Sequence, residues 1–180
     1  MIEKYKFTKN YIRQYHDAIP NDLSYEILSQ LDLAFYPATT NNGKINEHRN
    51  CFIKKLDEKF NDEISKIYLN VFKSYIKEFK FFDGIKMETS GFDHLLYKGE
   101  ESHEYKEHVD HSQFTKPRLI SCSLLLNDDY EGGNFSFFGG EYVVSRLAYS
   151  AIVVPSNPCF PHSITPIYQG DRHSIITWVH

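Results

Sequence analysis

Hydrophobic residues follow two different periods along this chain, one in each half. In the front half, Leu23, Ile27 and Leu31 recur at helical spacing after Pro20, which favours the start of a helix. A second helix is predicted to begin near Asn61 or Asp62. Its apolar stripe would consist of Ile64, Ile67, Val71, Tyr75 and Phe79. Both helices are expected to pack against a sheet.

From about residue 91 onward, short apolar runs alternate with turn-forming residues, a pattern typical of strands. The expected strands are Phe92–Tyr97, Tyr105–Val109, Arg118–Leu126, Asn134–Phe138, Glu141–Ser145, Ser150–Val154, His162–Pro166 and His173–Val179. About eight short strands with little helix between them predict a mainly β fold, a double-sheet jelly-roll barrel. We expect one domain over residues 1–180, with a helical support layer at 1–90 and the jelly-roll core at 91–180.

Composition fits a single folded domain and argues against several classes of partner. The chain has 180 residues, of which 41% are hydrophobic and 16% aromatic. This is enough to form a core without disulfide or metal cross-links. The net charge is only -4 and the basic residues are scattered, so a nucleic-acid partner is not expected. No apolar run reaches the roughly 20 residues that span a bilayer, and the first residues lack the apolar segment of a signal peptide.

The cysteines give a further expectation about the compartment. There are three, Cys51, Cys122 and Cys159, and their spacing matches no zinc-binding pattern. We interpret them as reduced thiols, which favours a reducing compartment. A cytoplasmic protein is therefore predicted.

The first chemical motif is His108-Val109-Asp110. Side chains at positions i and i+2 of a strand point to the same face, so His108 and Asp110 can both enter the interior of the barrel. His162, late in the series of strands, is the best third ligand. Two histidines and one carboxylate leave three positions of an octahedral metal open, the arrangement associated with non-haem Fe(II) oxygenases.

Ten residues past His162 lies Arg172, followed by Ser174 at the same strand parity. A guanidinium group binds a carboxylate through two parallel hydrogen bonds and stays charged at any relevant pH. Arg172 and Ser174 can therefore hold the distal carboxylate of a dicarboxylic acid whose other end chelates the metal. His173 lies between them and is expected to face away from their cavity.

At these residues the chain resembles the Fe(II)/2-oxoglutarate-dependent dioxygenase superfamily, and more closely its prolyl 4-hydroxylase-like branch. The resemblance covers about residues 91–180. Its motif is H-x-D, a distal His and a basic residue about ten positions on, here His108, Asp110, His162 and Arg172. The surroundings are also similar at Leu95–Gly99, Arg118–Asn127, Tyr130–Phe135, Ala151–Pro155 and Pro161.

The resemblance implies a double-stranded β-helix fold that uses Fe(II), 2-oxoglutarate and O2 and releases succinate and CO2. It also implies that Tyr97 hydrogen-bonds the cosubstrate. One position departs from the family: relatives often carry a cosubstrate-binding Tyr two residues before Asn127, where this chain has Leu125. Arg172 and Ser174 would then carry more of the binding. Because halogenating relatives replace the carboxylate of the H-x-D motif, Asp110 favours hydroxylation.

The expected activity is hydroxylation of an unactivated C–H bond, of a prolyl residue or a related amino-acid substrate, supplied as a small molecule or a peptide. Three alternatives stay open: a hydroxylase of another small metabolite, a non-catalytic cupin-like module that binds metal or sugar, and a structural jelly roll without iron. Candidate substrate loops are Tyr36–His48, His94–Tyr105 and His111–Pro117. Candidate cavity walls and entrance residues are Trp178, Phe135, Phe137, Phe138, His103 and His111.

Overall fold

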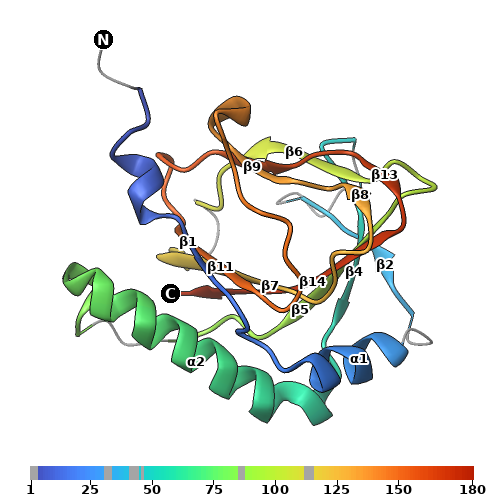
Figure 1. The fold of residues 1–180 in the computed structure, drawn as a ribbon, viewed down its shortest axis with the longest axis horizontal. Helices are drawn as coiled ribbons and strands as arrows, with labels where there is room; N and C mark the ends of the chain where they lie inside the picture. The colour runs from blue at the N-terminus through green and yellow to red at the C-terminus, as the bar shows by residue number, and fades with distance from the viewer. Residues whose placement is uncertain (1–3, 31–33, 41–44, 46, 85–87, 112–115) are drawn as a thin grey trace.

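The computed structural model describes residues 4–30, 34–40, 45, 47–84, 88–111 and 116–180. Two antiparallel sheets face one another, and the two α-helices lie on the outer side of the larger sheet (Figure 1). The strand order of the larger sheet is β1 (Arg13–Tyr15), β11 (Ala151–Pro155), β7 (Ile120–Leu125), β14 (Asp171–Val179), β5 (Asp93–Lys98), β4 (Phe52–Lys55) and β2 (Tyr36–Pro37).

The smaller sheet closes over the inner face of the larger one (Figure 1). Its strand order is β10 (Tyr142–Val143), β9 (Phe135–Phe137), β12 (His162–Ile164), β6 (Glu104–His108) and β3 (Arg49–Asn50). A separate antiparallel pair joins β13 (Ile167–Gln169) to β8 (Glu131–Gly132). Among the described strands no pairing connects the sheets edge to edge, so the predicted mainly β fold is confirmed as two open sheets rather than a closed barrel.

The two helices form because each offers one apolar face to the larger sheet. Helix α1 (Asn21–Ser29) buries Leu23 and Ile27, and the Ser24 hydroxyl donates to the Leu126 carbonyl at 2.7 Å. The predicted stripe position at Leu31 lies outside the described residues. Short 3-10 helices occur at Thr8–Tyr11, Glu58–Phe60, Lys80–Phe82 and Phe138–Gly140.

Helix α2 (Asn61–Glu78) begins where the sequence predicts, but its buried stripe is wider than expected. Tyr68 and Phe72 are buried, whereas the predicted Ile67 and Phe79 are only partly buried. The Tyr68 hydroxyl donates to the Ile175 carbonyl at 2.7 Å, which satisfies its polar atom inside the core. Among the described residues, no helix is both long and apolar enough to cross a membrane.

Residues 1–90 are not purely helical, contrary to the expected support layer. They also contribute β1, β2, β3 and β4 to the two sheets. These strands are two to four residues long, too short for an alternating pattern to be visible in the sequence. All three cysteines are free thiols; Cys51 and Cys122 are buried and Cys159 is exposed.

Strand β7 shows how the fold separates the core from the site. Cys122 and Leu124 point into the core beneath the helices, and Ser121 and Ser123 point to the opposite face, between the two sheets. The inner face of this central strand therefore places small polar side chains where the candidate site lies.

Candidate metal and cosubstrate site

His108, Asp110 and His162 converge between the two sheets. His108 ends β6 and His162 begins β12, and the two residues are directly paired across these strands. One ligand atom from each of the three residues lies within 4.8 Å of the others. Strand β6 ends at His108, one residue before the expected end at Val109, and Asp110 follows in a bend. Strand alternation therefore does not explain how its carboxylate reaches the histidines.

Both histidines present the nitrogen that a metal needs. His108 Nδ1 lies 2.8 Å from the Lys106 carbonyl oxygen, and His162 Nδ1 lies 3.0 Å from that of Phe160. A carbonyl only accepts hydrogen bonds, so each Nδ1 carries a proton, and in the neutral imidazole Nε2 is then the nitrogen with a free lone pair. Each Nε2 is 3.8 Å from a carboxylate oxygen of Asp110. Burial lowers the pKa of His108 to about 3, so this imidazole stays neutral.

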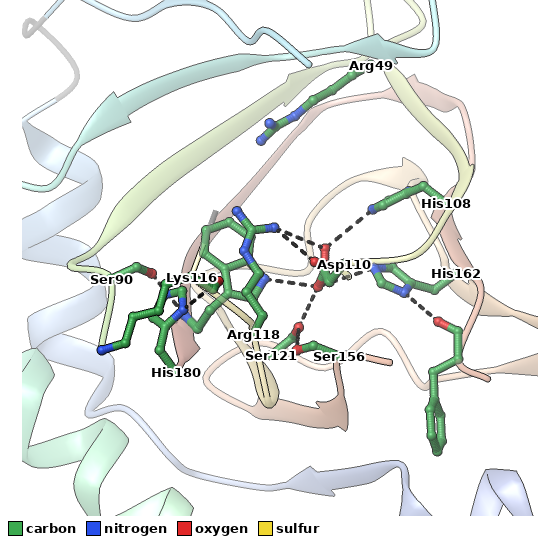
Figure 2. Close-up of polar contacts among 12 residues, drawn as sticks. Arg49, Ser90, His108, Asp110, Lys116, Arg118, Ser121, Ser156, His162 and His180 are labelled. Atoms are coloured by element: carbon green, nitrogen blue, oxygen red, sulfur yellow. Dashed lines mark hydrogen bonds and ion pairs between the residues drawn. The ribbon is translucent and has the colours of Figure 1, made fainter. Parts of the chain in front are cut away.

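The carboxylate of Asp110 is held by two donors from the larger sheet (Figure 2). Oδ2 accepts from the Ser121 hydroxyl at 2.5 Å and from the Trp178 indole N–H at 3.0 Å. Ser121 has only one proton, so Ser156, whose oxygen is 2.6 Å away, must donate to Ser121. Burial alone would raise the pKa of Asp110, but the neighbouring imidazoles and these hydrogen bonds lower it below its ordinary value. The group is therefore ionised and fixed in orientation.

Arg172 is the largest side chain that is almost completely buried, with only 2% of its surface exposed. Its Nη1 donates to the Ser174 hydroxyl at 2.9 Å, and its guanidinium carbon lies 5.4 Å from the centre of the Tyr97 ring. No carboxylate of the described residues forms an ion pair with it. A buried cation without a counter-ion costs several kcal/mol, so this position is built for an anionic ligand.

The cavity between the sheets brings the predicted site residues together. It is lined by His108, Asp110, His162, Arg172, Ser174 and Tyr97. Of the four aromatic residues considered as walls, Phe135 and Trp178 line the cavity, whereas Phe137 and Phe138 belong to a hydrophobic cluster beside it. Leu125 is buried in that same cluster and contributes no polar atom to the cavity.

The other histidines serve different purposes. His103 is buried, accepts from the Lys98 backbone N–H at 3.2 Å and lies 3.0 Å from Glu101 Oε2, so it braces a turn and does not line an entrance. His173 faces away from the cavity as expected, and its Nδ1 lies 3.1 Å from Nε2 of the fully buried His94. The candidate substrate loops at 36–48 and 111–117 lie partly outside the described residues.

Arg49 and Arg118 also line the cavity. Neither arginine was predicted from the sequence as a site residue. Arg118 stacks on the Trp178 ring at 3.7 Å and lies 3.9 Å from Asp110 Oδ1. Arg49 reaches the cavity because β3 pairs with β6, which sets Arg49 opposite Tyr105. That pairing joins segments more than fifty positions apart, and no local sequence signal indicates it.

Comparison with known proteins agrees with this geometry. Residues 93–180 match the sequence model of the 2OG-Fe(II) oxygenase superfamily. A PKHD-type hydroxylase of Alteromonas mediterranea is 34% identical over 90 residues, which span 44% of this chain and 39% of that relative.

Solved structures agree over nearly the whole chain. A prolyl-4-hydroxylase of Pseudomonas putida superposes with a TM-score of 0.70 at 20% identity, covering 94% of this chain and 91% of that one. A prolyl hydroxylase of Trichoplax adhaerens, in complex with a peptide fragment of hypoxia inducible factor, gives a TM-score of 0.73 at 17% identity, covering 98% and 93%. Residues 93–180 are therefore similar to the 2OG-Fe(II) oxygenase superfamily, and the fold of the chain is similar to that of prolyl 4-hydroxylases.

Proposed function

We propose that this protein is an Fe(II)- and 2-oxoglutarate-dependent dioxygenase that hydroxylates a prolyl residue or a related amino-acid substrate. One observation carries the proposal: a 2-His-1-carboxylate cluster and a buried guanidinium without a counter-ion share one cavity. A simple metal-binding barrel needs no buried Arg172. The prolyl part of the proposal is supported by the named activities of the similar proteins.

The donor set fits Fe(II). His108 and His162 each offer an Nε2, and Asp110 offers a carboxylate oxygen, all within 4.8 Å of one another. Two imidazoles and one carboxylate form the facial triad of non-haem Fe(II) oxygenases. The hydrogen bonds from Ser121 and Trp178 would keep the carboxylate in place whether or not the metal is bound.

The remaining side chains of the cavity suit 2-oxoglutarate. Arg172 would bind the distal carboxylate of the cosubstrate through its guanidinium group, with Ser174 as a second donor. Tyr97 lies against the guanidinium and lines the same cavity. When bound, Fe(II) and 2-oxoglutarate supply the oxidation: O2 gives one oxygen atom to the substrate C–H bond and one to succinate, with loss of CO2.

The experiment measures succinate formed from 2-oxoglutarate, and the iron bound by the protein. We expect turnover that requires Fe(II) and is lost in His108→Ala, Asp110→Ala and His162→Ala together with iron binding. Arg172→Met should retain iron but raise the 2-oxoglutarate concentration for half-maximal turnover by roughly 10- to 100-fold, since charged hydrogen bonds contribute about 1.5–3 kcal/mol. Iron bound equally well by all three triad variants would refute the assignment of the ligands.

A further inference from the structure

With the metal bound, the cavity would contain more positive charge than Asp110 and the cosubstrate neutralise. Three guanidinium groups line it, those of Arg49, Arg118 and Arg172, and one carboxylate, that of Asp110. Two charges on Fe(II) and one on Arg172 balance those of Asp110 and of the two carboxylates of 2-oxoglutarate. Arg118 shares the carboxylate of Asp110, 3.9 Å away, with the metal, and Arg49 is left without a counter-charge in a partly enclosed space. Such cations are costly unless an anion accompanies them.

Arg49 is the less satisfied of the two. Its Nη1 donates to the Thr39 carbonyl at 3.1 Å, and its Nε is buried without a hydrogen-bond partner. None of the described carboxylates forms an ion pair with it. Arg118 also has a buried Nε without a hydrogen-bond partner, but its Nη1 donates to the Asp110 carbonyl at 3.3 Å and lies 3.9 Å from the Asp110 carboxylate.

The position of Arg49 relative to the metal ligands is set by one aromatic ring. Its guanidinium carbon lies 5.1 Å from the centre of the Tyr105 ring, and that ring stacks on His108 at 3.5 Å. Figure 2 shows Arg49 and Arg118 extending toward one another on the side of Asp110 away from His162. Two guanidinium groups that line the same cavity repel one another. An anion between them would relieve that repulsion.

We propose that Arg49 determines substrate specificity by binding a carboxylate of the substrate. The inference rests on the proposed function and narrows it. The hydroxylated residue would carry a free α-carboxylate, either as a free amino acid or as the C-terminal residue of a peptide. A residue inside a peptide chain has a neutral amide at that position and would leave Arg49 unpaired.

The test compares acids with their amides at saturating 2-oxoglutarate: L-proline against L-prolinamide, and one prolyl-terminated peptide against its C-terminal amide. We expect the wild type to favour the acid of a pair by about 10- to 100-fold in kcat/KM, the range of one charged hydrogen-bonded pair. Arg49→Met should abolish this preference by weakening the acid alone, and Arg49→Lys should restore part of it. A preference seen with proline over prolinamide indicates a free amino acid as the substrate. A preference seen with the peptide over its amide indicates the C-terminal residue of a peptide.

Arg146→Met is the matched control, because Arg146 is an exposed arginine that does not line the cavity. It should keep the full preference for the acid. Equal kcat/KM for acid and amide in the wild type, or an Arg49→Met variant that instead raises the 2-oxoglutarate requirement, would overturn the inference.

A second readout does not depend on turnover. Calorimetry without O2, on the Fe(II)-loaded protein with saturating 2-oxoglutarate, should show the acid binding more tightly than the amide and Arg49→Met removing the difference. Absence of succinate with every substrate would contradict the proposed function, and this binding comparison would still decide the role of Arg49. Succinate formed equally well with acid and amide would contradict only the inference.

Discussion

The hydrogen bond from Ser121 to Asp110 allows a sharp test of how the chain prepares its metal site. Ser121→Ala removes the 2.5 Å donor to Oδ2 and leaves Trp178 as the second donor to the same oxygen. A hydrogen bond to a charged group contributes about 1.5–3 kcal/mol, and partners that orient metal ligands typically account for about 10- to 100-fold in affinity. We therefore expect the Kd for Fe(II) to rise by roughly 10- to 100-fold.

The assay is an anaerobic Fe(II) titration followed by calorimetry or by competition with a chelator. Ser123→Ala is the matched control, because Ser123 lies two residues further along β7 on the same inner face and is not one of the two donors to the Asp110 carboxylate. Ser156→Ala should give an intermediate effect, since Ser156 acts on the carboxylate only through Ser121. An unchanged Fe(II) affinity in Ser121→Ala, with the fold intact by circular dichroism, would show that the carboxylate needs no such support.

Further predictions concern the cosubstrate pocket and stability. Ser174→Ala removes the 2.9 Å partner of Arg172 and should raise the 2-oxoglutarate KM by roughly tenfold or less, measured by succinate formation, with iron affinity unchanged. Gly133→Ala should destabilise the protein in urea, because the residue has φ +59° and an added Cβ would clash with Ile167 Cδ1. Burial lowers the pKa of His173 to about 4 and also lowers that of His94. Since the folded state then binds fewer protons than the unfolded state, stability is complete above about pH 6.5 and falls toward pH 4, by roughly 3 kcal/mol for His173 alone. Urea unfolding at pH 7 and pH 5 should show this loss, and His173→Asn should make it smaller.

The sequence could predict those parts of the fold in which an element is long enough to show a repeating hydrophobic pattern. The strands β5, β7, β11 and β14 are five to nine residues long and were expected at nearly their observed bounds. The strands β2 and β3 have two residues each and owe their conformation to pairing with β4 and β6. Local sequence therefore contains no signal for them.

The candidate site divides in the same way. His108, Asp110, His162 and Arg172 could be predicted as site residues from their spacing in the sequence. The structure brings all four to one cavity. The support of Asp110 by Trp178 joins residues 68 positions apart, and it depends on how the bend after β6 meets the larger sheet. Such contacts arise only from the tertiary structure, because no periodicity links the segments that make them.

The central claim is that one cavity binds Fe(II) through the triad and 2-oxoglutarate through Arg172. The most direct measurement is an anaerobic titration of 2-oxoglutarate into the protein, with and without Fe(II). We predict one binding site per chain that is strong only with Fe(II) present, weakened by roughly 10- to 100-fold in Arg172→Met and lost to the level of the iron-free protein in His108→Ala. Binding of 2-oxoglutarate that is independent of Fe(II), or unchanged in Arg172→Met, would contradict the account.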